Sequence, residues 1–89
     1  SRGLGDVYKR QLQPLLDYDA GHHADLVETL FCYLKNNGSV KAVADEMFIH
    51  KNTIVYRMSK IKELLQADLE LGEERMAYYL ACLIVRKNH

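Results

Sequence analysis

The stretch ADEMFIHKNTIVYRMSKI, from Ala44 to Ile61, decides the fold of this chain. Its first residues suit a short helix, and the apolar residues 47–49 mark the point where that helix stops. A longer helix follows that is basic and polar at its start, with apolar residues at helical spacing: Ile54, Met58, Ile61 and Leu65. A short helix, a tight turn and a longer helix form the helix-turn-helix pattern, in which the second helix enters the major groove of DNA.

The composition indicates one compact domain. A chain of 89 residues forms a single domain, and an apolar fraction of 48% is ample for a helical core. One proline and five glycines argue against a disordered or repetitive chain. No apolar run approaches the roughly 20 residues that cross a membrane, and the first residues lack the apolar core of a signal peptide. We therefore expect a soluble, cytoplasmic protein.

The charges are unevenly distributed although their formal sum is zero. The segment 48–62 holds basic residues and no acid: Lys51, Arg57, Lys60 and Lys62. The segment that follows is acidic, with Glu63, Asp68, Glu70, Glu73 and Glu74. This separation is typical of a module with one anionic partner on one face. The zero net charge predicts modest affinity for a single copy, so we expect dimerisation or a larger parent protein.

Hydrophobic spacing and turn residues predict an all-α domain, a small helical bundle containing a helix-turn-helix in a Fis-like arrangement. The helices are expected at about 12–17, 23–36, 40–47, 51–66 and 73–87. Asp19, Ala20 and Gly21 are expected to break the chain, Asn36-Asn37-Gly38 to stop the next helix, and Ser39 to cap the helix after it. In the last helix we expect an inward face of Met76, Leu80, Leu83 and Ile84.

The first eleven residues differ from the rest. The segment 1–11 has two glycines, mixed charge and no clear amphipathic period, and Ser1 is not an initiator methionine. We expect this leader to be disordered or non-native, for example a remnant of cloning or sequence assembly, in a fragment or processed chain. The helix-turn-helix domain is expected to occupy residues 12–89.

Cysteines and histidines give little support for a metal or catalytic site. Cys32 and Cys82 each lie in an apolar helical pattern without a CxxC neighbour, so we expect two buried thiols. His22 and His23 are adjacent, and neighbouring helical residues point about 100° apart, which prevents easy convergence on one ion. We expect no metal, no cofactor and no catalytic residues.

The polar start of the longer helix supplies the candidate DNA contacts. Asparagine pairs with adenine, arginine and lysine pair with guanine, and a threonine methyl contacts thymine. The candidates for groove contacts are Lys51, Asn52, Thr53 and Tyr56. The candidates for phosphate contacts are Lys41, His50, Arg57 and Lys60. A purely structural reading stays open, because His50, Asn52 and Thr53 could simply cap a helix.

The segment FIHKNTIVYRMSKIKELL resembles the C-terminal helix-turn-helix of PucR/CdaR-type bacterial transcription regulators. The matching motif is a hydrophobic pair, His50, a variable residue, Asn52-Thr53, a hydrophobic residue, and then Tyr56-Arg57. The likeness extends over about residues 12–86, with Gly72 standing where relatives often carry a polar cap. The resemblance implies sequence-specific binding of double-stranded DNA, and transcriptional control by a parent protein with an upstream sensor region.

Other functions remain open from the sequence. A helical protein–protein interaction or dimerisation module would fit the exposed Tyr56 and the zero net charge, and it predicts no salt-dependent DNA binding. An enzyme has little support, because the chain has no glycine-rich phosphate loop and no nucleophile constellation. RNA binding lacks the aromatic platform on which single strands stack. We expect a DNA-binding homodimer, paired through this domain or an upstream region, with no membrane partner.

Overall fold

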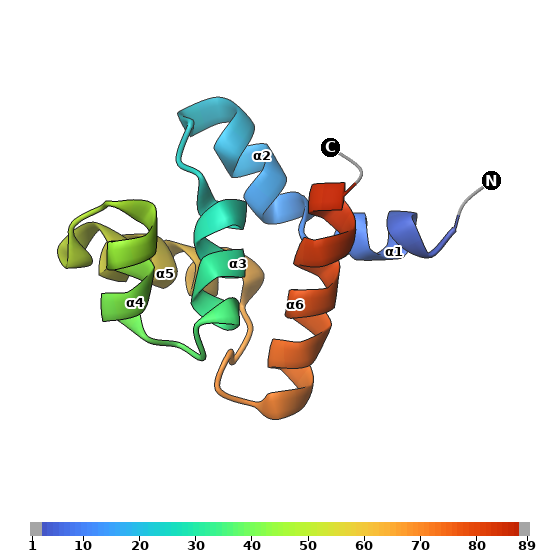
Figure 1. Cartoon of the computed structure of the whole chain (residues 1–89). Helices are drawn as coiled ribbons and strands as arrows, with labels where there is room; N and C mark the ends of the chain where they lie inside the picture. The colour runs from blue at the N-terminus through green and yellow to red at the C-terminus, as the bar shows by residue number, and fades with distance from the viewer. Residues whose placement is uncertain (1–2, 88–89) are drawn as a thin grey trace.

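A computed structural model describes residues 3–87 of the chain. The described residues form six helices and no strand (Figure 1): α1 (Leu4–Gln11), α2 (Gln13–His22), α3 (Leu26–Lys35), α4 (Val40–Met47), α5 (Lys51–Leu65) and α6 (Gly72–Lys87). The predicted all-α bundle with a helix-turn-helix is confirmed, since α4 and α5 are the two helices of that motif. No described helix is both long and apolar enough to traverse a lipid bilayer.

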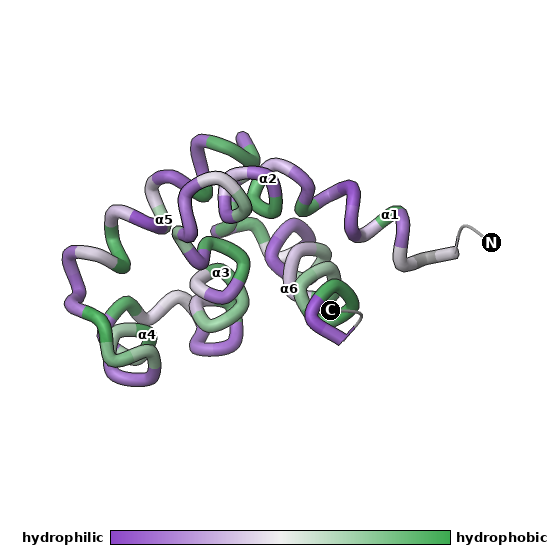
Figure 2. The backbone as a smooth tube through the Cα atoms, turned by 90° about the horizontal axis from the view of Figure 1, so that it is seen from above, coloured by the Kyte–Doolittle hydropathy of each residue, from purple (hydrophilic) through white to green (hydrophobic). Residues whose placement is uncertain are grey.

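Helix α3 forms the centre of the domain. Every residue of α3 except Glu28 and Lys35 is buried, because neighbours pack on it from several sides. Seen from above, α4 and α5 lie on one side of α3 and α6 lies on the other (Figure 2). The largest side chains with almost no exposure come from five segments: Leu12, Leu15, Leu26, Leu30, Ile54, Ile61 and Leu69. This shared core fixes α5 against the rest of the molecule.

The turn between α3 and α4 follows the predicted chemistry. Asn37 and Gly38 adopt left-handed conformations with φ of 54° and 81°, and the Gly38 amide donates to the Tyr33 carbonyl at 2.9 Å. Ser39 then caps α4, since its hydroxyl accepts from the Ala42 amide at 3.1 Å. The start of α4 is therefore fixed by local sequence, as expected.

The predicted break at residues 19–21 is wrong. Helix α2 continues to His22, and the chain turns at His23 and Asp25, which have φ of 52° and 54°. The Asp19 carboxylate accepts from the Leu26 and Val27 amides at 2.7 and 3.1 Å, so it satisfies the free N–H groups at the start of α3. Asp19 thus caps the following helix across the turn instead of ending its own.

The expectation of a disordered leader does not hold for residues 4–11, which form α1. Asp6 lies in its first turn and Lys9 and Arg10 in its last, an order that suits the helix dipole. Helix α1 packs against α6, and Tyr8 is half-buried there. Ser1 and Arg2 lie outside the described residues, as do the last two residues of the predicted domain. A non-native origin for the leader stays a prediction.

The predicted inward face of α6 is wrong for three of its four residues. The buried residues are Ala81, Cys82 and Val85, whereas Met76, Leu80 and Leu83 are 68%, 42% and 40% exposed, and Ile84 is half-buried. Small side chains at 81 and 82 let α6 approach its neighbours closely. On the side toward α3, the Tyr79 ring stacks on Phe31 with centroids 5.7 Å apart, and the Arg86 guanidinium lies 3.9 Å from the Phe31 ring centroid. These contacts turn the larger apolar residues of α6 toward solvent.

Candidate nucleic-acid interface

The turn of the helix-turn-helix is built by Phe48, Ile49 and His50. Phe48 ends α4 in a left-handed conformation with φ of 58°, and the Ile49 amide donates to the Ala44 carbonyl at 3.1 Å. His50 then caps α5, because its Nδ1 accepts from the Asn52 amide at 3.0 Å. This bond leaves the proton on Nε2, which can donate outward. The capping alternative is therefore confirmed for His50, and a phosphate contact through Nε2 is compatible with it.

The inner face of α5 anchors the helix in the core. Ile54, Met58 and Ile61 are buried, and Leu65 is half-buried against the same cluster. The spacing of these residues had predicted this face. Because the face is held by α2, α3 and α4 together, the orientation of the opposite face is fixed as well.

One flank of α5 packs against α2 and α3 and contains three of the predicted site residues, Thr53, Arg57 and Lys60. All three are half-buried. Arg57 donates from Nη1 to the hydroxyl of the fully buried Thr29 at 3.3 Å. Lys60 pairs with Glu63 at 3.2 Å and lies 5.2 Å from the Tyr18 ring centroid. The hydrogen bond to Glu63 raises the pKa of Lys60. These side chains are held at the edge of the helix.

The opposite part of α5 is open to solvent. Six exposed residues span about 140° of arc at 100° per residue, and we call them the outer face of α5: Lys51, Asn52, Val55, Tyr56, Ser59 and Lys62. Glu63 falls in the same arc, in the last turn, where it is already paired with Lys60. Within residues 3–87, Lys51 and Lys62 make no ion pair. Tyr56 is 64% exposed and Val55 is 53% exposed. The outer face thus combines two unpaired ammonium groups with polar and apolar side chains.

Lys41, the remaining predicted site residue, lies on α4. It is exposed and pairs loosely with Asp45 at 3.4 Å, one helical turn further on. An exposed pair of this kind contributes little energy, so a phosphate can displace the carboxylate. Lys41 stands in the first turn of α4, where free backbone N–H groups favour anions.

Four exposed, non-acidic residues of the motif were not among the predicted contacts: Phe48, Val55, Ser59 and Lys62. Phe48 is 93% exposed. Lys62 carries a charge that the basic segment had already indicated. Val55 and Phe48 were passed over because apolar residues give no charge or hydrogen-bonding signal in the sequence.

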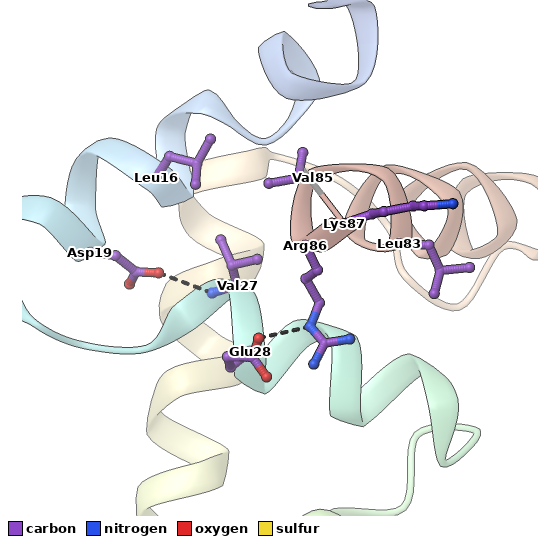
Figure 3. Close-up of a pocket in the computed structure, with 8 residues that line it drawn as sticks. All are labelled: Leu16, Asp19, Val27, Glu28, Leu83, Val85, Arg86 and Lys87. Carbon is purple, nitrogen blue, oxygen red and sulfur yellow. Dashed lines mark hydrogen bonds and ion pairs between the residues drawn. The ribbon is translucent and has the colours of Figure 1, made fainter. Parts of the chain in front are cut away.

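A hollow lies at the junction of α2, α3 and α6, and none of the described residues that line it comes from α5 (Figure 3). Three of its polar residues, Asp19, Glu28 and Arg86, already have structural partners. Asp19 accepts the backbone bonds that start α3, and Glu28 accepts from Arg86 Nε at 2.7 Å. Leu16, Val27, Leu83 and Val85 supply apolar walls. The hollow has the chemistry of a packing junction.

The histidine and cysteine pairs have structural roles. His22 stacks on Tyr18 with ring centroids 4.0 Å apart, and His23 ends α2 in a left-handed conformation. Cys32 and Cys82 are buried and free, as predicted, and burial raises the pKa of Cys82 to about 12. No group of three or more possible metal-binding side chains occurs among the residues that the structure describes.

Comparison with known families agrees with this geometry. The family model of the PucR C-terminal helix-turn-helix domain matches residues 26–84, which include α3, α4, α5 and most of α6. This chain belongs to the PucR family. The match begins at the first residue of α3, so it leaves α1 and α2 outside.

Characterised regulators are among the relatives. The chain is 36% identical over 69 residues to the proline-responsive transcriptional activator PutR of Bacillus subtilis, covering 78% of this chain and 17% of that protein. It is 32% identical over 83 residues to the purine catabolism regulatory protein of the same organism, covering 93% and 15%. It is 36% identical over 56 residues to the carbohydrate diacid regulator of Escherichia coli, covering 63% and 14%.

The chain spans about a sixth of the length of the first of these relatives. No solved structure matches it significantly. Together, the family match and the α4–α5 geometry identify a helix-turn-helix domain of a PucR-type transcriptional regulator.

Proposed function

We propose that the chain binds double-stranded DNA in a sequence-specific manner by placing the outer face of α5 in the major groove, in the bacterial cytoplasm, as the DNA-binding part of a longer regulator. The observation that carries this proposal is that α5 has a packed side and an exposed side. Its inner face and one flank are held by the core, while the outer face stays exposed and carries Lys51 and Lys62, which form no ion pair within residues 3–87. The role is one of binding, and no catalytic step is assigned.

In this proposal the exposed polar residues at the start of α5 read bases. Asn52 can bond adenine through two hydrogen bonds, and Lys51 can donate to guanine. Tyr56, one turn further on, can donate to a base or a phosphate. Thr53 is half-buried at the edge and reaches the groove with its methyl or hydroxyl group.

Cations around this face would hold the DNA backbone. Lys41 and the Nε2 group of His50 flank the start of α5, and Lys62 lies toward its end. Arg57 and Lys60 contribute from the packed flank, because the bond to Thr29 uses only one guanidinium nitrogen of Arg57. Such contacts fix the register of the protein on DNA without reading the sequence.

A binding selection tests the proposal. The purified chain is mixed with a randomised duplex library, and bound duplexes are recovered and sequenced. Enrichment of one motif is expected for the unaltered chain. Asn52→Ala should lower affinity for that motif by about 1–3 kcal/mol and relax preference at one position. Gln66→Ala, just beyond α5, is the matched control. Equal losses on all duplexes for Asn52→Ala would remove this residue from base reading.

Dimerisation is the second part of the proposal. One recognition helix reads only a few base pairs, and two half-sites would supply the missing affinity. The exposed residues Met76, Leu80 and Leu83 follow the four- and three-residue spacing of paired helices. We therefore propose that α6 contributes to pairing, alone or with an upstream region.

Sedimentation velocity over a concentration series tests the α6 interface. The unaltered chain should shift toward twice its 10.3 kDa mass as concentration rises. Leu80→Glu should keep it monomeric, whereas Val55→Glu on the other side of the domain should not. A chain that stays monomeric at all concentrations would assign pairing to the upstream region.

The competing reading, a protein-interaction module, makes a different prediction. Such a module would bind its partner protein through Tyr56. It would show no salt-dependent affinity for any DNA duplex. The absence of enrichment in the selection would favour that reading.

A further inference from the structure

Val55 is an exposed apolar residue in the middle of an otherwise polar surface. It is 53% exposed, and it lies one turn after Asn52 and one turn before Ser59 on the outer face of α5. At 100° per residue, its side chain points about 60° from Asn52 and about 40° from Ser59. A groove that receives Asn52 and Ser59 therefore also receives Val55.

The fold gains little from a valine at this position. Its β-branched side chain is a weaker helix former than alanine, and more than half of its surface stays in water. Isolated exposed apolar residues are ordinary on proteins. What distinguishes Val55 is its neighbourhood, since it is flanked by the groups that the proposed function aims at base edges. An apolar group there has one apolar partner in the major groove, the C5-methyl group of thymine.

We propose that Val55 contacts the C5-methyl group of a thymine and selects T·A over C·G at one position of the DNA site. The inference rests on the proposed function and adds the chemistry of one base contact. Cytosine carries a hydrogen where thymine carries the methyl group, so an isopropyl side chain packed there gains contact with thymine only. The preference differs from hydrogen-bonded readout because it depends on one methyl group.

Uracil substitution tests this contact at the level of a single methyl group. The probe is a duplex selected from the randomised library with the unaltered chain. Each thymidine in turn is replaced by deoxyuridine, which removes the methyl group and keeps every hydrogen-bonding atom. One replacement should weaken binding by the unaltered chain about threefold to fivefold, the effect expected for burying one methyl group.

The Val55→Ala variant removes the protein side of the same contact. Alanine favours the helix, so this variant should fold at least as well as the original. It should bind the thymine duplex about threefold to fivefold more weakly and should no longer distinguish thymine from uracil at the sensitive position. Thr53→Ser, which removes a methyl group from the neighbouring flank of α5, is the control and should leave discrimination at that position intact.

The outcomes separate this inference from the proposed function. Salt-dependent, sequence-selective binding with no sensitivity to any uracil replacement would overturn the Val55 contact and leave DNA binding in place. Full uracil sensitivity in Val55→Ala would also overturn it and assign the methyl contact to another residue. Failure to select any duplex would overturn the proposed function and this contact together.

Discussion

The hydrogen bond between Arg57 and Thr29 predicts that Arg57 stabilises the fold, in addition to any contact that it makes with DNA. Arg57 Nη1 lies 3.3 Å from the hydroxyl of Thr29, which is completely buried in α3. The same hydroxyl donates to the Asp25 carbonyl at 2.7 Å. Removing the arginine therefore leaves no orphaned buried group, and its cost should stay near the value of one hydrogen bond.

Arg57→Met keeps most of the aliphatic packing and removes the guanidinium. A bond of this length between a charged and a neutral group should contribute about 1 kcal/mol to the free energy of unfolding. For a domain of this size, such a loss lowers Tm by about 4–8 °C. Thr29→Val removes the hydroxyl with little change in volume and should cost about 1–2 kcal/mol, because it also deletes the bond to Asp25.

A double-mutant cycle isolates the pair. Urea unfolding followed by circular dichroism, for the original chain, both single variants and the double variant, should give a coupling energy of about 0.5–1 kcal/mol. Arg57→Lys should not restore it, because an ammonium lacks the planar geometry of the guanidinium. If the stability losses of the two single variants add up in the double variant, the coupling energy is near zero. That result would refute a structural role for this bond and leave Arg57 with a role in DNA binding only.

Three further predictions concern stability and reactivity. Phe48→Gly should raise the free energy of unfolding by about 0.5–1 kcal/mol in urea melts, because φ is 58° and the ring is 93% exposed; a loss would show that the ring packs in solution. Cys82 should resist a thiol reagent at pH 8 until urea unfolds the chain, because burial raises its pKa to about 12; labelling of the folded chain at the rate of a free thiol would contradict its burial. Lys35 lowers the pKa of Glu46, so the stability from this pair exists above the ordinary Glu range and is lost as pH falls through the lowered pKa. Acid titration of stability should show this component in the original chain and not in Glu46→Gln.

The motif itself was predictable from the sequence because its determinants are local. Ser39 and the Asn37-Gly38 turn fix the start of α4, and the spacing of Ile54, Met58 and Ile61 fixes the inner face of α5.

The errors arose where distant contacts decide the structure. Asp19 was interpreted as a break, but its carboxylate caps α3 seven and eight residues later. The face of α6 depends on Phe31 and on the close approach allowed by Ala81 and Cys82, which hydrophobic spacing alone does not reveal. The contacts of Lys60 with Tyr18 from α2 and with Glu63 hold it at the flank of α5, which the local sequence did not indicate.

The salt dependence of DNA affinity tests the central claim most directly. Fluorescence anisotropy at several salt concentrations would compare the original chain, Lys62→Ala and Lys9→Ala, which removes the same charge from α1. DNA binding through α5 predicts that affinity falls steeply with salt, and that Lys62→Ala alone reduces the slope of log Kd against log salt by about one. A salt-independent affinity, or equal effects of the two substitutions, would contradict DNA binding by the outer face of α5.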